Sequence, residues 1–288
     1  MDFLSPDTLA EALELKAARP SAVPIAGGTD VMVELNFDHR RPDALLNLNR
    51  VSSLYGYSTV DGQVRIGACM PYSRIITELG SSLPGLAMAA RTVGSPQIRN
   101  RGSVGGNLGA ASPAGDSHPA LLATDATVEI ASTRGVRMVP VKDFYVGVKR
   151  NVLSPDELIT AVHVPPATGP QQFSKVGTRN AMVIAVCAFA IALHPAQKRV
   201  GTGIGSAAPT PLRAYEAEEF LNAELPWGSS EALYDSMLRR FGELVAGAAS
   251  PIDDVRGTAS YRRHALAVMA RRTLGWTWDE YRRSAQCA

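Results

Sequence analysis

The chain has 288 residues, which is long enough for two domains and a well-buried core. Its 29 basic and 27 acidic residues leave a net charge of +2 and are interleaved along the sequence, so a nucleic-acid-binding surface is not expected. The three cysteines lie far apart and form no C-x-x-C pair, which argues against a zinc or iron–sulfur site in this chain.

The amino-terminal segment predicts a helix followed by a β–turn–α–β unit. A Ser-Pro pair beginning at Ser5 suits an N-cap and a first helical position, so we expect a helix from there to Pro20. Apolar runs predict strands at 22–26 and 45–48, with a helix between them at 31–37. The start of that second helix would present backbone amides to an anion.

The next segment predicts a second α/β lobe. The stretch 95–112 is rich in Gly, Asn and Arg, and we expect it to be a loop that is held by contacts rather than by regular structure. The regular elements are expected at 64–69 (strand), 72–79 (helix), 84–90 (helix), 119–123 (helix), 128–131 with 136–139 (hairpin) and 158–164 (strand).

Pro and Gly residues cluster at 167–170 between two apolar segments, which predicts a domain boundary. We therefore expect a first domain at 1–170, with lobes at about 1–55 and 56–170, and a second domain at 171–288. The fold class predicted for both is α+β. The second domain is expected to hold an antiparallel sheet at 172–193 and 200–204 and helices at 215–221, 231–248 and 261–274.

A first glycine signature, Ala26-Gly27-Gly28-Thr29-Asp30, directly follows a predicted strand. Paired glycines at a strand end let backbone amides approach an anion that side chains would block. An ordinary strand-to-helix turn explains the pair equally well. A carboxylate aimed at a phosphate would be repelled, so we expect Asp30 to cap the following helix or to pin the loop, with Gly27 to Thr29 as the donors.

A second signature, Ser103-Val104-Gly105-Gly106-Asn107, is followed by Asp116. Two such loops in one domain suggest one long ligand whose phosphates lie between them. Asp116 either caps the helix expected at 119–123 or accepts a hydrogen bond from a ribose-type hydroxyl, and the residues alone leave both roles open.

Other patterns do not meet the requirements of a catalytic or metal site. Gly201-x-Gly203-x-Gly205 has the wrong spacing for a dinucleotide fingerprint and precedes a Pro-rich segment that cannot open a helix. The histidines show no metal-ligand spacing, and His118 is interpreted as part of a surface helix start rather than as an acid–base partner. Lys175 is either an exposed edge charge or a donor to a phosphate or ring carbonyl. We assign no catalytic residue and no metal ligand.

Taken in order, these segments resemble the FAD-binding, or medium, subunit of molybdenum hydroxylases, the family of xanthine dehydrogenase and carbon monoxide dehydrogenase. The resemblance covers nearly the whole chain, and the ordered set is specific where either glycine pair alone is weak. It rests on the amino-terminal helix and on residues 26–30, 97–107, 111–116, 155–159, 175, 254–257 and 261–264.

The resemblance implies a two-lobed FAD-binding domain of the vanillyl-alcohol-oxidase type, followed by a smaller α+β domain. Both signatures would wrap the pyrophosphate, and Asp116 would accept a hydroxyl from the ribose or ribityl region. The animal enzymes carry an aromatic residue at the position of Val93, so an aliphatic contact replaces ring stacking there, and no His or Cys is placed for covalent attachment of the flavin. The implied FAD-binding residues are Ala26, Gly27, Gly28, Thr29, Asp30, Val93, Ser103, Val104, Gly105, Gly106, Asn107, Asp116, Leu158, Lys175 and Ile184.

The resemblance also implies an electron-transfer subunit of a heterotrimer, with a small [2Fe–2S] subunit and a large molybdopterin subunit as partners. A purine such as xanthine is the leading substrate and NAD⁺ the leading acceptor; other N-heterocycles, aldehydes or carbon monoxide, and oxygen or a quinone, stay open. A stand-alone flavin oxidase would need a catalytic base or a covalent linkage site, and we find neither. A nucleotide-binding module with a decayed flavin site is opposed by the intact glycine pairs. With no signal peptide and no apolar stretch long enough for a bilayer, the expected location is cytoplasmic.

Overall fold

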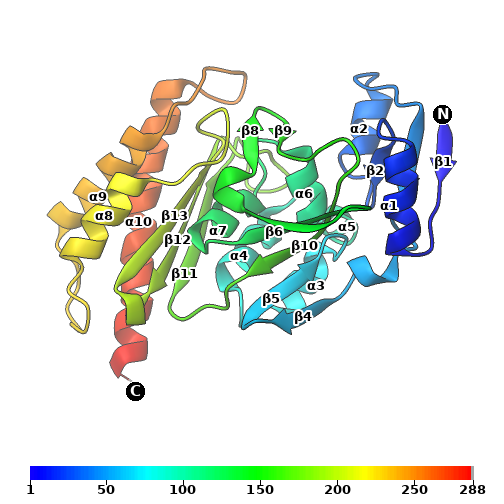
Figure 1. Ribbon diagram of the computed structural model, residues 1–288. Coiled ribbons are helices and arrows are strands. Elements are labelled where there is room, and N and C mark those ends of the chain that lie inside the picture. The colour runs from blue at the N-terminus through cyan, green and yellow to red at the C-terminus, as the bar shows by residue number, and fades with distance from the viewer. Residues whose placement is uncertain (287–288) are drawn as a thin grey trace.

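The computed structural model describes residues 1–286 as a row of layers (Figure 1). A small sheet with two helices lies at the amino-terminal side, and a five-stranded sheet follows. Beyond a layer of helices come a second three-stranded sheet and, at the far side, the carboxy-terminal helices. The α+β class expected from the sequence is confirmed.

The amino-terminal lobe is a parallel sheet covered by two helices. Its middle strand pairs in parallel register with both neighbours, so strand ends and helix starts meet at one edge. The elements are β1 (Asp2–Leu4), α1 (Leu9–Ala18), β2 (Val23–Ile25), α2 (Val31–Asn36) and β3 (Ala44–Asn47), with sheet order β1-β3-β2.

The helix expected from Ser5 begins later than predicted. Residues 2–4 pair with β3 as a strand, and the chain has to leave that strand before a helix can start. The cap is Thr8, whose hydroxyl accepts a hydrogen bond from the backbone N–H of Glu11 at 3.2 Å. Long-range strand pairing therefore outweighed a favourable local start signal.

The second lobe is built on an antiparallel sheet with β10 (Leu158–Val164) as its middle strand, and all seven side chains of that strand are buried. The edge strand β4 (Tyr57–Val60) was not predicted, because its four side chains are all exposed and show no apolar alternation. The sheet order is β4-β5 (Gln63–Gly67)-β10-β6 (Thr127–Ser132)-β7 (Gly135–Pro140).

Helices and short elements complete this lobe. Its helices are α3 (Tyr72–Glu78), α4 (Pro84–Thr92), α5 (Pro96–Arg99), α6 (Val104–Ala110) and α7 (Ser117–Ala123), and a two-stranded hairpin comprises β8 (Tyr145–Gly147) and β9 (Arg150–Asn151). Single 3₁₀ turns lie at Ser52–Leu54, Val141–Asp143 and Pro195–Gln197.

The stretch 95–112, expected to be a loop, contains two helices instead. Each has a serine cap: Ser95 Oγ accepts from the Ile98 N–H at 3.3 Å and Ser103 Oγ accepts from the Gly106 N–H at 3.1 Å. The glycine that would weaken α6 is needed there, because a Cβ atom at Gly105 would lie 2.5 Å from the backbone oxygen of Ala68. The second glycine signature is therefore the first turn of a helix.

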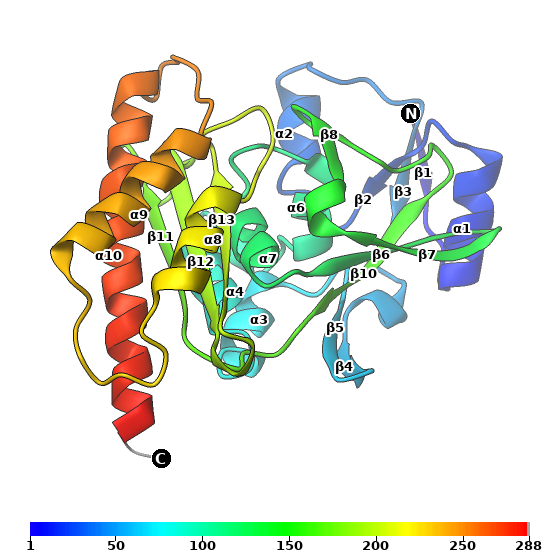
Figure 2. The ribbon, with the colours of Figure 1, turned by 60° about the vertical axis from the view of Figure 1, so that its left-hand side comes forward.

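The carboxy-terminal sheet has helices on both faces (Figure 2). Side chains of its middle strand alternate between two hydrophobic clusters: Ala188 and Ala190 pack toward α4 and α7, while Phe189 and Ile191 pack toward the last three helices. The elements are β11 (Gln171–Val176), β12 (Cys187–His194), β13 (Arg199–Gly205), α8 (Tyr215–Glu224), α9 (Asp235–Ala248) and α10 (Ala259–Gln286).

The Gly-x-Gly run in β13 serves this packing. A Cβ atom at Gly201 would lie 2.1 Å from the carbonyl oxygen of Ala123, and one at Gly203 would lie 2.0 Å from that of Pro119. Helix α7 thus lies directly on the strand, and the run has a structural role in place of nucleotide binding.

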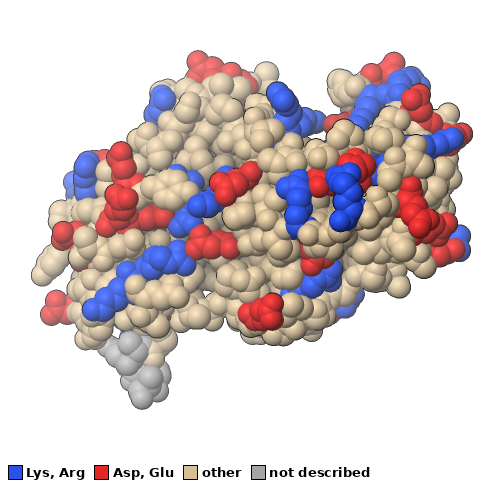
Figure 3. Space-filling view, viewed as in Figure 1, with Lys and Arg blue, Asp and Glu red and all other residues tan. Residues whose placement is uncertain are grey.

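Within residues 1–286, no helix combines the length and apolar character needed to cross a bilayer. Basic and acidic side chains are interleaved on the face shown in Figure 3, with no extended patch of one sign.

Candidate functional site

The first glycine signature forms a turn with unused backbone donors between β2 and α2. Gly28 has φ +73°, a conformation that favours glycine, and turns the chain into the helix. Among the hydrogen bonds of residues 1–286, the backbone N–H groups of residues 27–31 have no acceptor in the protein. Asp30 stands at the N-cap position but its side chain makes no capping hydrogen bond, so the capping role expected for it is wrong. Consecutive free amides of this kind suit an anion.

The structure brings the first glycine signature into direct contact with residues 101–102, which immediately precede the second signature. A Cβ atom at Gly27 would lie 1.9 Å from the carbonyl oxygen of Arg101, and one at Gly102 would lie 3.4 Å from Thr29 Oγ1. Only glycine at position 27 allows the backbones to approach this closely. A ligand held by the first signature therefore also lies beside the segment that leads into the second.

The second signature offers fewer free amides than the first. Three of its five amides are used inside the protein: Gly105 N–H donates to the Ala68 carbonyl at 3.1 Å, Gly106 N–H to Ser103 Oγ at 3.1 Å and Asn107 N–H to the Ser103 carbonyl at 3.0 Å. These bonds fix the shape of the turn. They leave the first signature as the main source of backbone donors.

Asp116 and Lys175 form a buried ion pair across 59 positions of sequence. Lys175 Nζ lies 2.6 Å from Asp116 Oδ2, and each side chain is only 8% exposed. Thr92 Oγ1 donates to the same oxygen at 3.2 Å, and the Thr92 carbonyl accepts from Lys175 Nζ at 3.2 Å. Lys175 is therefore not an exposed edge charge.

One oxygen of this pair has no partner. Asp116 Oδ1 is buried and accepts no hydrogen bond from residues 1–286, and Asp116 makes no capping bond to α7. Burial raises the pKa of the Asp116 carboxyl, although Lys175 opposes the shift. A buried carboxylate oxygen without a donor suits a ligand hydroxyl, which supports the second of the two roles left open by the sequence.

A hydrogen-bonded chain links Asn107 to the start of α7. Ser117 Oγ donates to Asn107 Oδ1 at 2.6 Å, and the Tyr72 hydroxyl donates to Ser117 Oγ at 3.2 Å. His118 is fully buried, with Nδ1 2.7 Å from the Tyr145 hydroxyl, so placing it on the surface was wrong. Burial lowers the pKa of His118 to about 3, which keeps the ring neutral.

The three remaining apolar positions lie in different environments. Val93 is half-buried where α4 ends, and its carbonyl accepts from Arg99 Nη1 at 3.0 Å. Ile184 lies in the segment between β11 and β12 and is 59% exposed. Leu158 is only 2% exposed and packs in a core cluster with Ala12 and Cys69, so it does not face the same space as Ile184.

Sequence reasoning missed a polar cluster beside the first signature. Asn49 Nδ2 donates to the Ala26 carbonyl at 2.9 Å and to Asn47 Oδ1 at 2.6 Å. Asn49 Oδ1 accepts from the Tyr55 hydroxyl at 2.9 Å and from Arg101 Nη2 at 3.2 Å. The sequence feature that could have indicated this cluster is the Asn-Leu-Asn run at the end of β3. The strand ends of a parallel sheet meet at the ligand-binding edge, so polar side chains there are candidates for the site.

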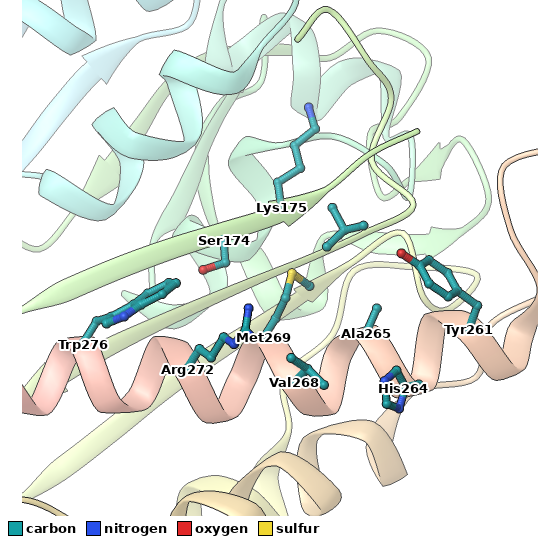
Figure 4. A pocket seen from close by; sticks show the side chains of 10 residues that line it. Ser174, Lys175, Tyr261, His264, Ala265, Val268, Met269, Arg272 and Trp276 are labelled. Atoms are coloured by element: carbon teal, nitrogen blue, oxygen red, sulfur yellow. The ribbon is translucent and has the colours of Figure 1, made fainter. Parts of the chain in front are cut away.

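A cavity of about 480 Å³ lies between β11 and α10 (Figure 4). The aliphatic stem of Lys175 forms part of its wall, while the side chain extends away from α10. Tyr261, Met269 and Trp276 line the helix side. The Asp116–Lys175 pair and this cavity thus share one residue.

Comparison with known proteins gives matches over nearly the whole chain. Residues 1–167 match the family described as the FAD binding domain in molybdopterin dehydrogenase, and residues 172–277 match the CO dehydrogenase flavoprotein C-terminal domain. The xanthine dehydrogenase FAD-binding subunit of Escherichia coli O157:H7 is 33% identical over 278 residues, covering 93% of this chain and 92% of that protein.

Two further similarities extend the comparison. The nicotinate dehydrogenase FAD-subunit of Eubacterium barkeri is 34% identical over 233 residues, covering 76% of this chain and 79% of that protein. Among solved structures, a chain of carbon monoxide dehydrogenase from Hydrogenophaga pseudoflava has a TM-score of 0.89 at 26% identity and covers 98% of both chains.

Proposed function

The chain belongs to the family of FAD-binding subunits of molybdenum hydroxylases, and from that premise we propose that it passes electrons from a [2Fe–2S] partner subunit to NAD⁺ while a large molybdopterin subunit hydroxylates a purine such as xanthine. The oxidoreductase family and the FAD-binding domain follow from the matches. The substrate, the acceptor and the partners are parts of the proposal.

The residues of the site fit FAD. The observation that carries the assignment is that one domain holds two kinds of unsatisfied polar group. These are the free amides of residues 27–31 and the buried oxygen Oδ1 of Asp116, which has no hydrogen-bond partner among residues 1–286. The amides match a diphosphate, and the carboxylate oxygen matches a sugar or ribityl hydroxyl. Both sets of groups lack a partner among residues 1–286, and a ligand carrying both functions would satisfy them together.

When bound, FAD supplies the exchange between one-electron and two-electron transfer. The protein residues bind and orient. Residues 27–31 donate to the diphosphate, Thr92 and Lys175 hold the Asp116 carboxylate in place, and Val93 and Ile184 are proposed to contact the flavin. We propose that the FAD is attached non-covalently and that the boundary between the two domains lies at about residue 170.

The purine assignment is supported by the similarity to the xanthine dehydrogenase subunit, with its high coverage of both chains. The similarity to the nicotinate dehydrogenase subunit, at 34% identity, favours a second candidate in which the same subunit serves another N-heterocycle. NAD⁺ is proposed from the resemblance to xanthine dehydrogenases. The expected cytoplasmic location stays a prediction.

The test is to purify the chain alone and together with its small and large partner subunits. We expect a yellow preparation that releases flavin on acid treatment, and turnover only in the complex. Purines, azaheterocycles, aldehydes and carbon monoxide would each be offered with NAD⁺, oxygen or a quinone. Turnover by the isolated chain would indicate a stand-alone oxidase, and a colourless chain that cannot be reconstituted would contradict the flavin assignment.

A further inference from the structure

We propose that Arg101 supplies the positive charge that holds the cofactor diphosphate at the junction of the two glycine signatures. This inference rests on the proposed FAD function and adds a residue that neither signature contains. The glycine signatures provide hydrogen-bond donors without net charge, whereas a diphosphate carries two negative charges. A cation placed beside the free amides would complete the site.

Arg101 lies in contact with the first signature. Its carbonyl oxygen would be 1.9 Å from a Cβ atom at Gly27, so the two backbones touch. Its guanidinium donates from Nη2 to Asn49 Oδ1 at 3.2 Å, and Asn49 in turn donates to the Ala26 carbonyl at 2.9 Å. The charged group is thereby held next to the turn that carries the free amides.

The side chain is free to accept an anion. Arg101 is exposed, and among residues 1–286 its side chain has no ion pair and a single hydrogen bond, the one to Asn49. A guanidinium has five N–H donors in a planar fork that suits phosphate oxygens. Lys149 is paired with Glu34 at 3.1 Å, so it is not free in the same way.

The charges around the first signature favour such a group. Asp30, at the end of the first signature, is an exposed carboxylate that makes no capping bond and would repel a diphosphate. Asn49 is oriented by Tyr55, whose hydroxyl donates to its Oδ1 at 2.9 Å. The neutral Asn49 amide therefore positions Arg101 without neutralising it.

The experiment measures ligand binding to the deflavinated full-length chain by titration calorimetry. The probes are FAD and ADP, which shares the diphosphate but has no flavin. In Arg101→Gln we expect both dissociation constants to rise by about ten- to a hundredfold at low salt, as expected for loss of a charge-assisted hydrogen bond. The ratio to wild type should shrink near 1 M salt, where the screening length falls to about 3 Å.

Two further variants separate charge from shape. Arg101→Lys keeps the charge, and its affinity for both probes should recover to within about tenfold of wild type. Arg263→Gln removes an exposed arginine from α10 and should leave both constants unchanged. Thermal unfolding without ligand checks that all variants fold alike.

Wild-type affinity in Arg101→Gln at low salt would overturn the proposal. So would equal losses in the Gln and Lys variants, because that result would assign Arg101 a purely structural contact with Asn49. A wild-type chain that binds ADP in an Arg101-dependent way but takes no FAD would support the diphosphate contact and refute the flavin function. A wild-type chain that binds neither probe would refute both.

Discussion

Replacing Lys175 by methionine tests the buried ion pair at the centre of the site. The substitution keeps the length and much of the apolar stem of the side chain but removes its charge. Asp116 would then keep a hydrogen bond from Thr92 at 3.2 Å and lose the ammonium at 2.6 Å. Removing one partner of a buried pair costs about 3–5 kcal/mol, because the remaining charge stays in a poorly solvated site.

That cost is a large fraction of the stability of an ordinary domain, which is about 5–15 kcal/mol. Its pH dependence has a definite sign. Burial already raises the pKa of Asp116 above 3.8, and Lys175 is the main group that opposes the rise, so the variant pKa is higher still. A raised carboxyl pKa means that the folded state binds the proton more tightly, so the penalty is smallest at acid pH and grows as pH rises through the folded-state pKa.

The assay is urea unfolding of wild type, Lys175→Met, Asp116→Asn and the double variant at about pH 8 and about pH 5. We expect the penalty of Lys175→Met to shrink at the lower pH, and the double variant to recover most of the loss. A penalty that does not change with pH, or a double variant as unstable as the single one, would refute the reasoning.

The other predictions concern the turn, the ligand hydroxyl and the buried histidine. Gly27→Ala should destroy flavin retention, because its Cβ atom would lie 1.9 Å from the Arg101 carbonyl oxygen; Gly247→Ala, in α9, would place its Cβ atom in open space and should keep the flavin, and equal flavin content in both would contradict the close-approach argument. Asp116→Ala should weaken FAD binding by about 1–3 kcal/mol in a fluorescence titration, and unchanged affinity would remove the carboxylate from the site. Burial lowers the pKa of His118 from 6.5 to about 3, so its neutral ring contributes stability above pH 6.5 that is lost as pH falls. The slope should be at most about 1.4 kcal/mol per pH unit, and His118→Asn should flatten it in unfolding curves measured between those values.

Periodicity and turn residues predicted most of the regular elements. The hairpin of β6 and β7, the middle strand β10 and the three last helices lie near their expected positions. Helix α10 extends to Gln286, well beyond the expected end at Leu274. The two strands that were not predicted have physical causes. Strand β1 forms only because β3 lies beside it, and β4 has no buried face and therefore shows no apolar pattern in the sequence.

The site was predictable in its residues but not in its connections. The free amides of the first signature follow from a Gly-Gly turn after a strand, which the sequence shows directly. The pair between Asp116 and Lys175 joins residues that no local pattern relates. The helix at Ser103 was missed because its three glycines have low helix propensity, and the need for Gly105 becomes visible only when Ala68 is seen against it.

The middle strand of the carboxy-terminal sheet packs against the domain that precedes it, so the two matched family segments share one hydrophobic cluster. Ala188 and Ala190 on one side and Phe189 and Ile191 on the other belong to different hydrophobic clusters, and the first cluster draws members from both segments. A chimera joined near residue 170 from two relatives would place one parent's alanines against the other parent's α7. Such a chimera would need matched changes on both sides of the join to restore this packing.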